Sequence, residues 1–127
     1  MSPVQGQESQ LLTHSKMYEI AEKYGVLRLK DLAREKLHHA CSHFWSSPSF
    51  PLAARHTFST TPADDKGLRT VVSETIANHM ELMEEPWVNE LLGEFNGLAR
   101  GILEAGIREH GWGKKASAKS QTLYKGF

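Results

Sequence analysis

Three histidines and the single cysteine lie close together in the sequence, and they form its most suggestive chemical cluster. They are His38, His39, Cys41 and His43. Neutral imidazole and thiolate are good zinc ligands, and two histidines four residues apart share one face of a helix. The neighbouring apolar residues argue against a metal site, because they place Cys41 on the buried side of that helix and His39 and His43 on the opposite side. We therefore expect no metal centre, since the four side chains do not converge.

No other residues in the sequence indicate catalysis. Cys41 lacks a motif that would activate it, so we expect a buried and unreactive thiol. His14, His56 and His79 lie at or near apolar stripes, where a histidine bonded within the core is commoner than a general base. The glycines between residues 93 and 106 are spread through an apolar-periodic segment and follow no strand, so they form no phosphate-binding loop. The sequence thus predicts no catalytic, cofactor-binding or metal-ligating residue, and no enzyme.

The length and composition are those of one small domain. The chain has 127 residues, of which 39% are hydrophobic and 24% charged, which is close to ordinary globular usage. The 15 basic and 15 acidic side chains cancel, which removes the usual electrostatic argument for nucleic acid or an anionic membrane as the main partner. No stretch approaches the ~20 apolar residues of a membrane helix, and the first ten residues hold no apolar run typical of a secretion signal. We expect an intracellular protein, cytoplasmic or nuclear.

The end of the sequence is basic. Lys114, Lys115, Lys119 and Lys125 lie there among small polar residues. Four lysines would neutralise few phosphates, so binding to nucleic acid would be weak and sensitive to salt. We interpret residues 113–127 as a flexible basic tail. A small helical regulator that associates with nucleic acid through this tail is the alternative function.

The apolar pattern predicts an all-α fold. Leucine and alanine number 14 and 11, whereas valine and isoleucine together number nine, and no segment alternates apolar and polar residues as a strand does. Three- and four-residue spacing predicts helices over 10–24 and 28–44, joined through Gly25 as a left-handed cap into a helical hairpin. We expect a small bundle of about five helices after a flexible N-terminus of residues 1–9. The remaining helices are predicted over 49–58, from Thr61-Pro62 to about Met83, and from Pro86 to about His110, with a kink near Asn96-Gly97.

Large apolar residues near the predicted helix ends complete the expected core. We expect Trp45 and Trp87 to cover junctions between helices. Trp112 could do the same or lie at a protein interface, where aromatic residues are enriched. In the last helix, Leu98, Ala99, Ile102 and Leu103 are expected to face inward, together with Val88, Leu91, Leu92 and Phe95.

Two segments resemble fungal BTB/POZ domain proteins. The first is HSKMYEIAEKYGV at residues 14–26 with LKDLAREKL at 29–37, which is similar to the helix pair that closes the BTB fold. The second combines Phe58, Thr61-Pro62 and DKGLR at 65–69, and resembles a stretch that these proteins carry after the BTB core. The resemblance covers roughly Leu11 to Trp112. The BTB β-sheet has no counterpart, so residues 10–112 are similar to the C-terminal, BACK-like helical region.

This resemblance implies an adaptor without catalytic residues. Such regions extend BTB domains and hold partner proteins, in ubiquitin-ligase or other regulatory complexes, and in some members they help to contact a cullin. We therefore expect a protein–protein interaction module. The apolar face of the first hairpin would meet the absent BTB core, so we expect it to be open to a partner protein or to a second copy. The candidate protein-binding residues are Met17, Tyr18, Ile20, Tyr24, Phe50, Phe58 and Trp112.

Overall fold

Helices are the regular secondary structure in the described part of the chain, and no strand occurs there, which confirms the all-α prediction. The computed structural model describes residues 3–113, with side chains from Gln10 onward. Within this range there are six α-helices and one 3-10 helix, where the sequence predicted about five helices. The helices are α1 (Pro3–Tyr24), α2 (Leu27–Phe44), α3 (Ser49–Thr60), α4 (Leu68–Asn78), η1 (Met80–Glu84), α5 (Pro86–Glu94) and α6 (Asn96–His110).

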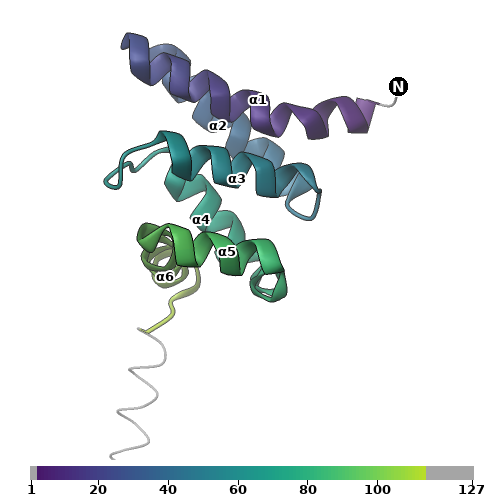
Figure 1. Ribbon diagram of the computed structural model, residues 1–127, viewed down its shortest axis with the longest axis vertical. Coiled ribbons are helices and arrows are strands. Elements are labelled where there is room, and N and C mark those ends of the chain that lie inside the picture. The colour runs from purple at the N-terminus through teal and green to yellow at the C-terminus, as the bar shows by residue number, and fades with distance from the viewer. Residues whose placement is uncertain (1–2, 114–127) are drawn as a thin grey trace, which may run out of the picture.

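Successive helix pairs are stacked along the long axis of the molecule. In Figure 1, α1, α3 and α5 lie one below another, with α2 and α4 behind them and α6 at the lower end. Helix α1 packs against α2 and α3, and α4 packs against α2 and α6. The first and last pairs therefore form the two ends of the stack, and each end pair keeps one side free of other described helices.

Gly25 ends α1 and turns the chain into α2. Its φ of +70° is left-handed, and the N–H groups of Gly25 and Val26 donate to the carbonyls of Glu22 and Ala21, at 3.4 and 2.9 Å. These two bonds form a Schellman motif, which satisfies carbonyls at the end of the helix. The predicted glycine cap and the predicted helical hairpin are both confirmed.

The first helix begins earlier than the sequence indicated. It starts at Pro3 rather than at Gln10, so residues 3–9, assigned above to a flexible N-terminus, are helical. These residues are mostly polar and carry no apolar stripe, so apolar periodicity could not predict a helix there. Proline is accepted in a first turn because its missing N–H would be unpaired there in any case. The predicted basic tail lies outside the described residues, except for Gly113.

Thr61-Pro62 ends a helix instead of opening one, which corrects the predicted start of the fourth helix. The Thr61 N–H donates to the carbonyl of Thr57 at 3.1 Å and closes α3. The chain then turns, with a bond of 3.0 Å from the Asp65 N–H to the Pro62 carbonyl, and α4 begins only at Leu68. The same helix ends early, at Asn78, and a separate 3-10 helix follows.

A break at Phe95 divides the predicted last helix. Phe95 is extended, with φ −123° and ψ 104°, so the interruption falls one residue before the kink that the sequence predicted at Asn96-Gly97. The break changes the rotational register of α6 relative to α5. Ala99 and Leu103 therefore face solvent, which contradicts the prediction that they point inward, whereas Leu98 and Ile102 are buried as predicted.

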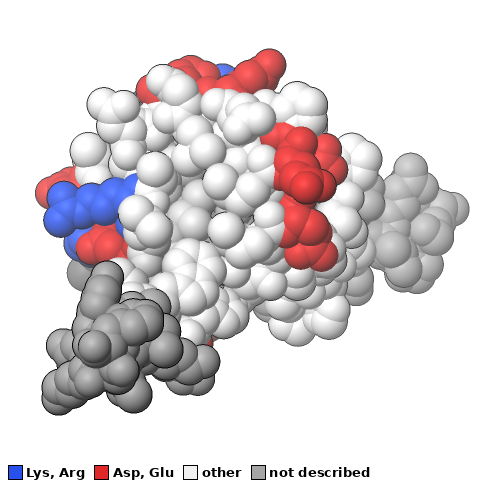
Figure 2. Space-filling view, turned by 90° about the horizontal axis from the view of Figure 1, so that it is seen from below, with Lys and Arg blue, Asp and Glu red and all other residues white. Residues whose placement is uncertain are grey.

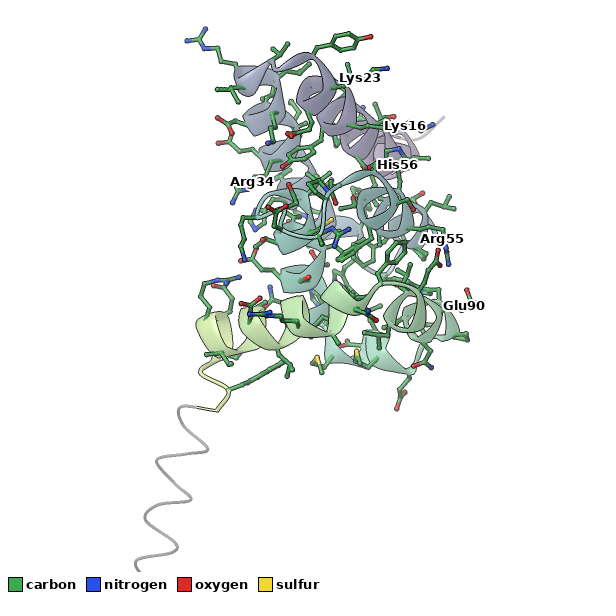
Figure 3. All side chains as sticks on the ribbon, turned by 60° about the vertical axis from the view of Figure 1, so that its left-hand side comes forward. Lys16, Lys23, Arg34, Arg55, His56 and Glu90 are labelled. Atoms are coloured by element: carbon green, nitrogen blue, oxygen red, sulfur yellow. The ribbon has the colours of Figure 1, made fainter. Side chains whose placement is uncertain are left out.

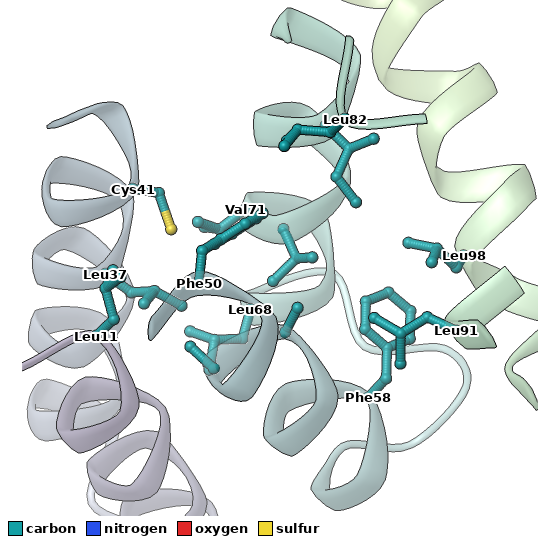
Figure 4. Packing of buried hydrophobic residues seen from close by; sticks show 14 of the residues in the cluster. Leu11, Leu37, Cys41, Phe50, Phe58, Leu68, Val71, Leu82, Leu91 and Leu98 are labelled. Carbon is teal, nitrogen blue, oxygen red and sulfur yellow. The ribbon is translucent and has the colours of Figure 1, made fainter. Parts of the chain in front are cut away.

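One apolar core runs through the whole stack. Leu11 and Leu37 of the first pair contribute to the same cluster as Phe50, Val71 and Leu98 of the later helices (Figure 4). The aromatic rings at its edge lie as predicted: Trp45 stacks on His79 with ring centroids 3.8 Å apart, and Trp87 meets Phe50 edge to face at 5.5 Å. The end pairs are thus fixed to one another through continuous packing.

Candidate protein-binding surface

Three of the candidate binding residues project from the outer side of α1. Met17 is 36% exposed, Ile20 51% and Tyr24 69%. Their spacing of three and four residues places them on one stripe of the helix. The structure therefore brings these three predicted residues together on an open surface.

Three other candidates are core residues, which corrects their assignment as binding anchors. Tyr18 and Phe58 are 2% exposed and Phe50 is fully buried. Tyr18 follows Met17 directly, but one residue is a rotation of about 100° around a helix, so the two side chains face different ways. Helical spacing identified apolar side chains without showing which of them the later helices cover.

Trp112 packs against the end of its own helix. Gly111, with φ +68°, ends α6, and the Trp112 N–H donates to the carbonyl of Gly106 at 3.2 Å. The indole ring then lies over Gly106, where a Cβ atom would overlap it. Trp112 is half-buried, so its ring mainly covers the end of α6 and is not a free anchor.

The exposed apolar residues continue from α1 onto the turn and α2. Val26, Leu27 and Leu32 are 46%, 71% and 46% exposed. Met17 and Leu32 line the same shallow groove between α1 and α2. We call this surface the hairpin face, defined by Met17, Ile20, Tyr24, Val26, Leu27 and Leu32.

The two ends of the stack differ in charge. Residues 10–45 carry six basic and four acidic side chains, whereas residues 80–113 carry two basic and seven acidic ones. Lys16 and Lys23 project near the hairpin face at one end in Figure 3, and Glu90 lies at the other. Figure 2 shows the lower end, where acidic groups lie at the top and right of a neutral surface and basic groups lie at its left edge. The hairpin face therefore has a mildly positive surround and the opposite end a negative one.

A polar network joins the two segments that carry the family resemblance. The Tyr18 hydroxyl donates to Asp65 Oδ1 at 2.8 Å, and the N–H groups of Gly67 and Arg69 donate to Asp65 Oδ2 at 3.1 Å. Burial and the bond to Asp65 raise the pKa of the Tyr18 phenol above its ordinary value. Sequence reasoning did not find this pairing, because Tyr18 and Asp65 are 47 residues apart.

A second network resembles a catalytic constellation but is closed to substrate. Ser15 Oγ lies 2.8 Å from His56 Nδ1, and His56 Nε2 lies 3.1 Å from Glu19 Oε1. Ser15 is fully buried, and its hydroxyl is also 3.0 Å from that of Thr57. No substrate carbonyl can reach this serine, so the network fastens α1 to α3. His56 is hydrogen-bonded, as predicted, but at a partly buried position rather than in the core.

The cysteine and histidines of α2 face apart, as the sequence predicted. Cys41 is fully buried, whereas His39 and His43 are exposed, with ring centroids 4.8 Å apart. His14 of α1 lines the same shallow pocket as these two histidines. The Nδ1 atom of His14 is buried and lacks a hydrogen-bond partner among residues 10–113. Burial is the main cause that lowers the pKa of His14, and the positive charge of nearby Lys36 lowers it further. Within the described residues, no three histidine, cysteine or acidic side chains lie close enough to hold a metal ion.

The Cys41 thiol is expected to be inert in the folded protein. Burial raises its pKa to about 12, so almost no thiolate forms near neutral pH, and the sulfur has no access to reagents. A disulfide reagent that releases a light-absorbing product on reaction with a thiol measures the accessibility of Cys41. At pH 8 we expect no reaction until denaturant is added, and one reactive thiol per chain afterwards. Rapid labelling without denaturant would contradict this burial and reopen thiol chemistry.

Comparisons with known proteins leave the family open. No protein-family model matches the chain, and no curated protein or solved structure is significantly similar to it. No helix in the described part of the chain has the length and apolar character needed to span a membrane.

Proposed function

We propose that the protein is a non-catalytic protein–protein interaction module that binds a partner protein on the hairpin face. The observation that supports this proposal is the exposure of six large apolar side chains at one end of the stack. Contiguous apolar surface of this kind on a small protein commonly marks an interaction site. Tyr24, an aromatic residue at the centre of the turn region, would be the main anchor.

The surroundings of the hairpin face suit an interface. Lys23 lies 5.6 Å from the centre of the Tyr24 ring, and Lys30 pairs with Glu22 beside it. Interfaces typically combine an apolar centre with a polar rim of this kind. Burying apolar area contributes about 25 cal/mol per Å², so a partner that covers Ile20, Tyr24 and Leu27 would gain substantially from them.

We further propose that the module is a BTB-associated, BACK-like adaptor region linked to ubiquitin-ligase or regulatory complexes. The support is the sequence resemblance, together with the bond between Tyr18 and Asp65, one residue from each resembling segment. In such a protein the hairpin face would meet the BTB core or the protein that takes its place. A contact with a cullin rests on the resemblance alone, whereas a cytoplasmic or nuclear location rests on the composition of the sequence.

Paired charge substitutions test the proposed surface. Ile20→Lys/Tyr24→Lys should abolish partner capture in an affinity pull-down with mass spectrometry, because two lysines would have to be buried without partners. Leu103→Lys/Ile107→Lys is the matched control, since it changes two exposed apolar residues at the opposite end. Capture of the same proteins by both double variants would refute the hairpin face as the binding surface.

Self-association is a separate version of the same proposal. If a second copy is the partner, sedimentation of the full chain should show a concentration-dependent dimer that Ile20→Lys/Tyr24→Lys removes.

The alternative function, association with nucleic acid, rests on a tail outside the described residues. The described residues include all but four of the basic side chains and every acidic one, so their net charge is negative and opposes that alternative.

A further inference from the structure

A cleft lies between α4 and α6, away from the hairpin face. Its volume is about 370 Å³. The α4 side contributes Arg69, Thr70 and Ser73, and the α6 side contributes Gly97, Arg100 and Gly101. Hydrogen-bond donors therefore line both walls.

The two glycines of α6 let donors on α4 reach the floor of the cleft. A Cβ atom at Gly97 would come within 3.2 Å of Arg69 Nη1, and one at Gly101 would overlap the Ser73 hydroxyl. Gly97 also lies in the first turn of α6, where backbone N–H groups have no partner within the helix and the helix dipole favours negative charge. Side chains at these positions would cover the donors.

The guanidinium of Arg69 is held in a fixed position. Its Nε donates to Thr61 Oγ1 at 2.8 Å, and its Nη2 donates to the carbonyls of Phe58 and Thr61 at 3.0 and 2.8 Å. Its third nitrogen, Nη1, makes no hydrogen bond within residues 10–113 and lies beside Gly97. Arg69 thus presents a preorganised, charged donor to the cleft.

Ser73 supplies an independent indication of a ligand. It is 2% exposed, and its hydroxyl makes no hydrogen bond within the described side chains and faces the cleft. A serine in a helix usually bonds to a backbone carbonyl, and Ser73 does not. Its hydroxyl is not fully enclosed, since His14 Nδ1 is the atom that is buried without a partner within residues 10–113. The Ser73 hydroxyl therefore remains available to a molecule in the cleft.

The acidic groups of the cleft are mostly engaged. Both oxygens of Asp65 accept bonds from Tyr18 or from backbone N–H groups. Glu104 lies 3.9 Å from Arg100, and Asp64 and Lys66 both line the cleft. Arg108 pairs with Glu74 at 3.0 Å. Four basic and three acidic side chains thus line the cleft, and Arg69 Nη1 and the Ser73 hydroxyl still have hydrogen bonds to donate.

We propose that this cleft binds a phosphate group, held by Arg69 Nη1, the Ser73 hydroxyl and the Gly97 N–H at the start of α6. These donors approach from α4 on one side of the cleft and from α6 on the other, so they can bond to different oxygens of one phosphate. A phosphate at a helix N-terminus beside arginine is favoured by both the dipole and the charge. This site is separate from the hairpin face and does not depend on its function.

NMR titration of the full chain with inorganic phosphate and with O-phosphoserine tests the proposal, at constant ionic strength. The Gly97 and Gly101 amide signals should shift and saturate, with acetate binding more weakly. Ser73→Ala should weaken binding about tenfold, the loss expected for one hydrogen bond to a charged group. Tighter binding of O-phosphoserine would identify a phosphoryl group on a larger ligand, and equal binding would identify free phosphate.

Gly97→Ala and Arg55→Gln complete the design. Gly97→Ala places a methyl group over Arg69 Nη1 and removes no charge, so it should abolish binding while the unfolding temperature does not fall. Arg55→Gln removes an exposed arginine of α3 that pairs with Glu94, outside the cleft, and should bind phosphate like the unsubstituted protein. Linear, non-saturating shifts, or unchanged affinity in both Ser73→Ala and Gly97→Ala, would overturn the proposal.

Discussion

Replacing Phe58 by alanine is expected to lower the free energy of unfolding by about 3–5 kcal/mol, the usual cost of removing a buried aromatic ring. Phe58 is 2% exposed, and its ring lies 5.8 Å from that of Phe95 and 4.7 Å from the guanidinium of Arg69. The substitution would leave a cavity where α3 meets the later helices. The Arg69 guanidinium would also lose the aromatic face on which it rests.

Denaturant unfolding measured by circular dichroism checks this expectation. Tyr24→Ala is the matched control, because it also removes an aromatic ring of the candidate set but at an exposed position, and it should change stability by no more than about 0.5 kcal/mol. Similar small losses for both variants would contradict the assignment of Phe58 to the core and return it to the binding candidates.

Gly67→Ala is expected to destabilise the protein by about 1–3 kcal/mol through overpacking. A Cβ atom at position 67 would overlap the Tyr18 hydroxyl and come within 3.0 Å of its ring carbon Cζ. The φ of Gly67 is −94°, outside the left-handed region, so the expected loss is attributed to the contact with Tyr18. Tyr18 would have to move away from Asp65, and the contact between the two resembling segments would weaken.

A double-mutant cycle with Tyr18→Phe isolates this contact. Tyr18→Phe alone should cost about 1.5–3 kcal/mol, as expected for a hydrogen bond to a charged group. In the double variant the new methyl group meets no hydroxyl, so the combined loss should be smaller than the sum of the single losses. Strict additivity would mean that Gly67 and Tyr18 do not touch.

Local signals explain how far the fold could be predicted. Gly25 directly after an apolar stripe was sufficient to place the first hairpin, because a glycine there has a specific conformational role. Thr61-Pro62 looked equally clear as a helix start, yet the decisive residue was Asp65. Its carboxylate binds the N–H groups of Gly67 and Arg69 and takes over the capping role at the start of α4. The same carboxylate accepts a bond from Tyr18, a tertiary partner that lies far away in the sequence.

The candidate surface was predictable only in part, for a similar reason. Periodicity grouped Met17, Ile20 and Tyr24, and these residues are exposed together. It could not show that α3 and the loop before α4 cover Tyr18, or that Phe50 and Phe58 face the core. The α4–α6 cleft left no sequence signal, because its donors Arg69 and Ser73 meet Gly97 and Gly101 only through tertiary packing.

Site-specific photo-crosslinking tests the proposed interaction surface most directly. A photoreactive amino acid would be introduced at position 20, on the hairpin face, and in a matched protein at position 103, at the opposite end. The proposal predicts that irradiation in cells joins position 20 to a distinct protein or to a second copy, and that position 103 gives no such product. Equal products from both positions, or a product from position 103 alone, would contradict the hairpin face as the binding surface.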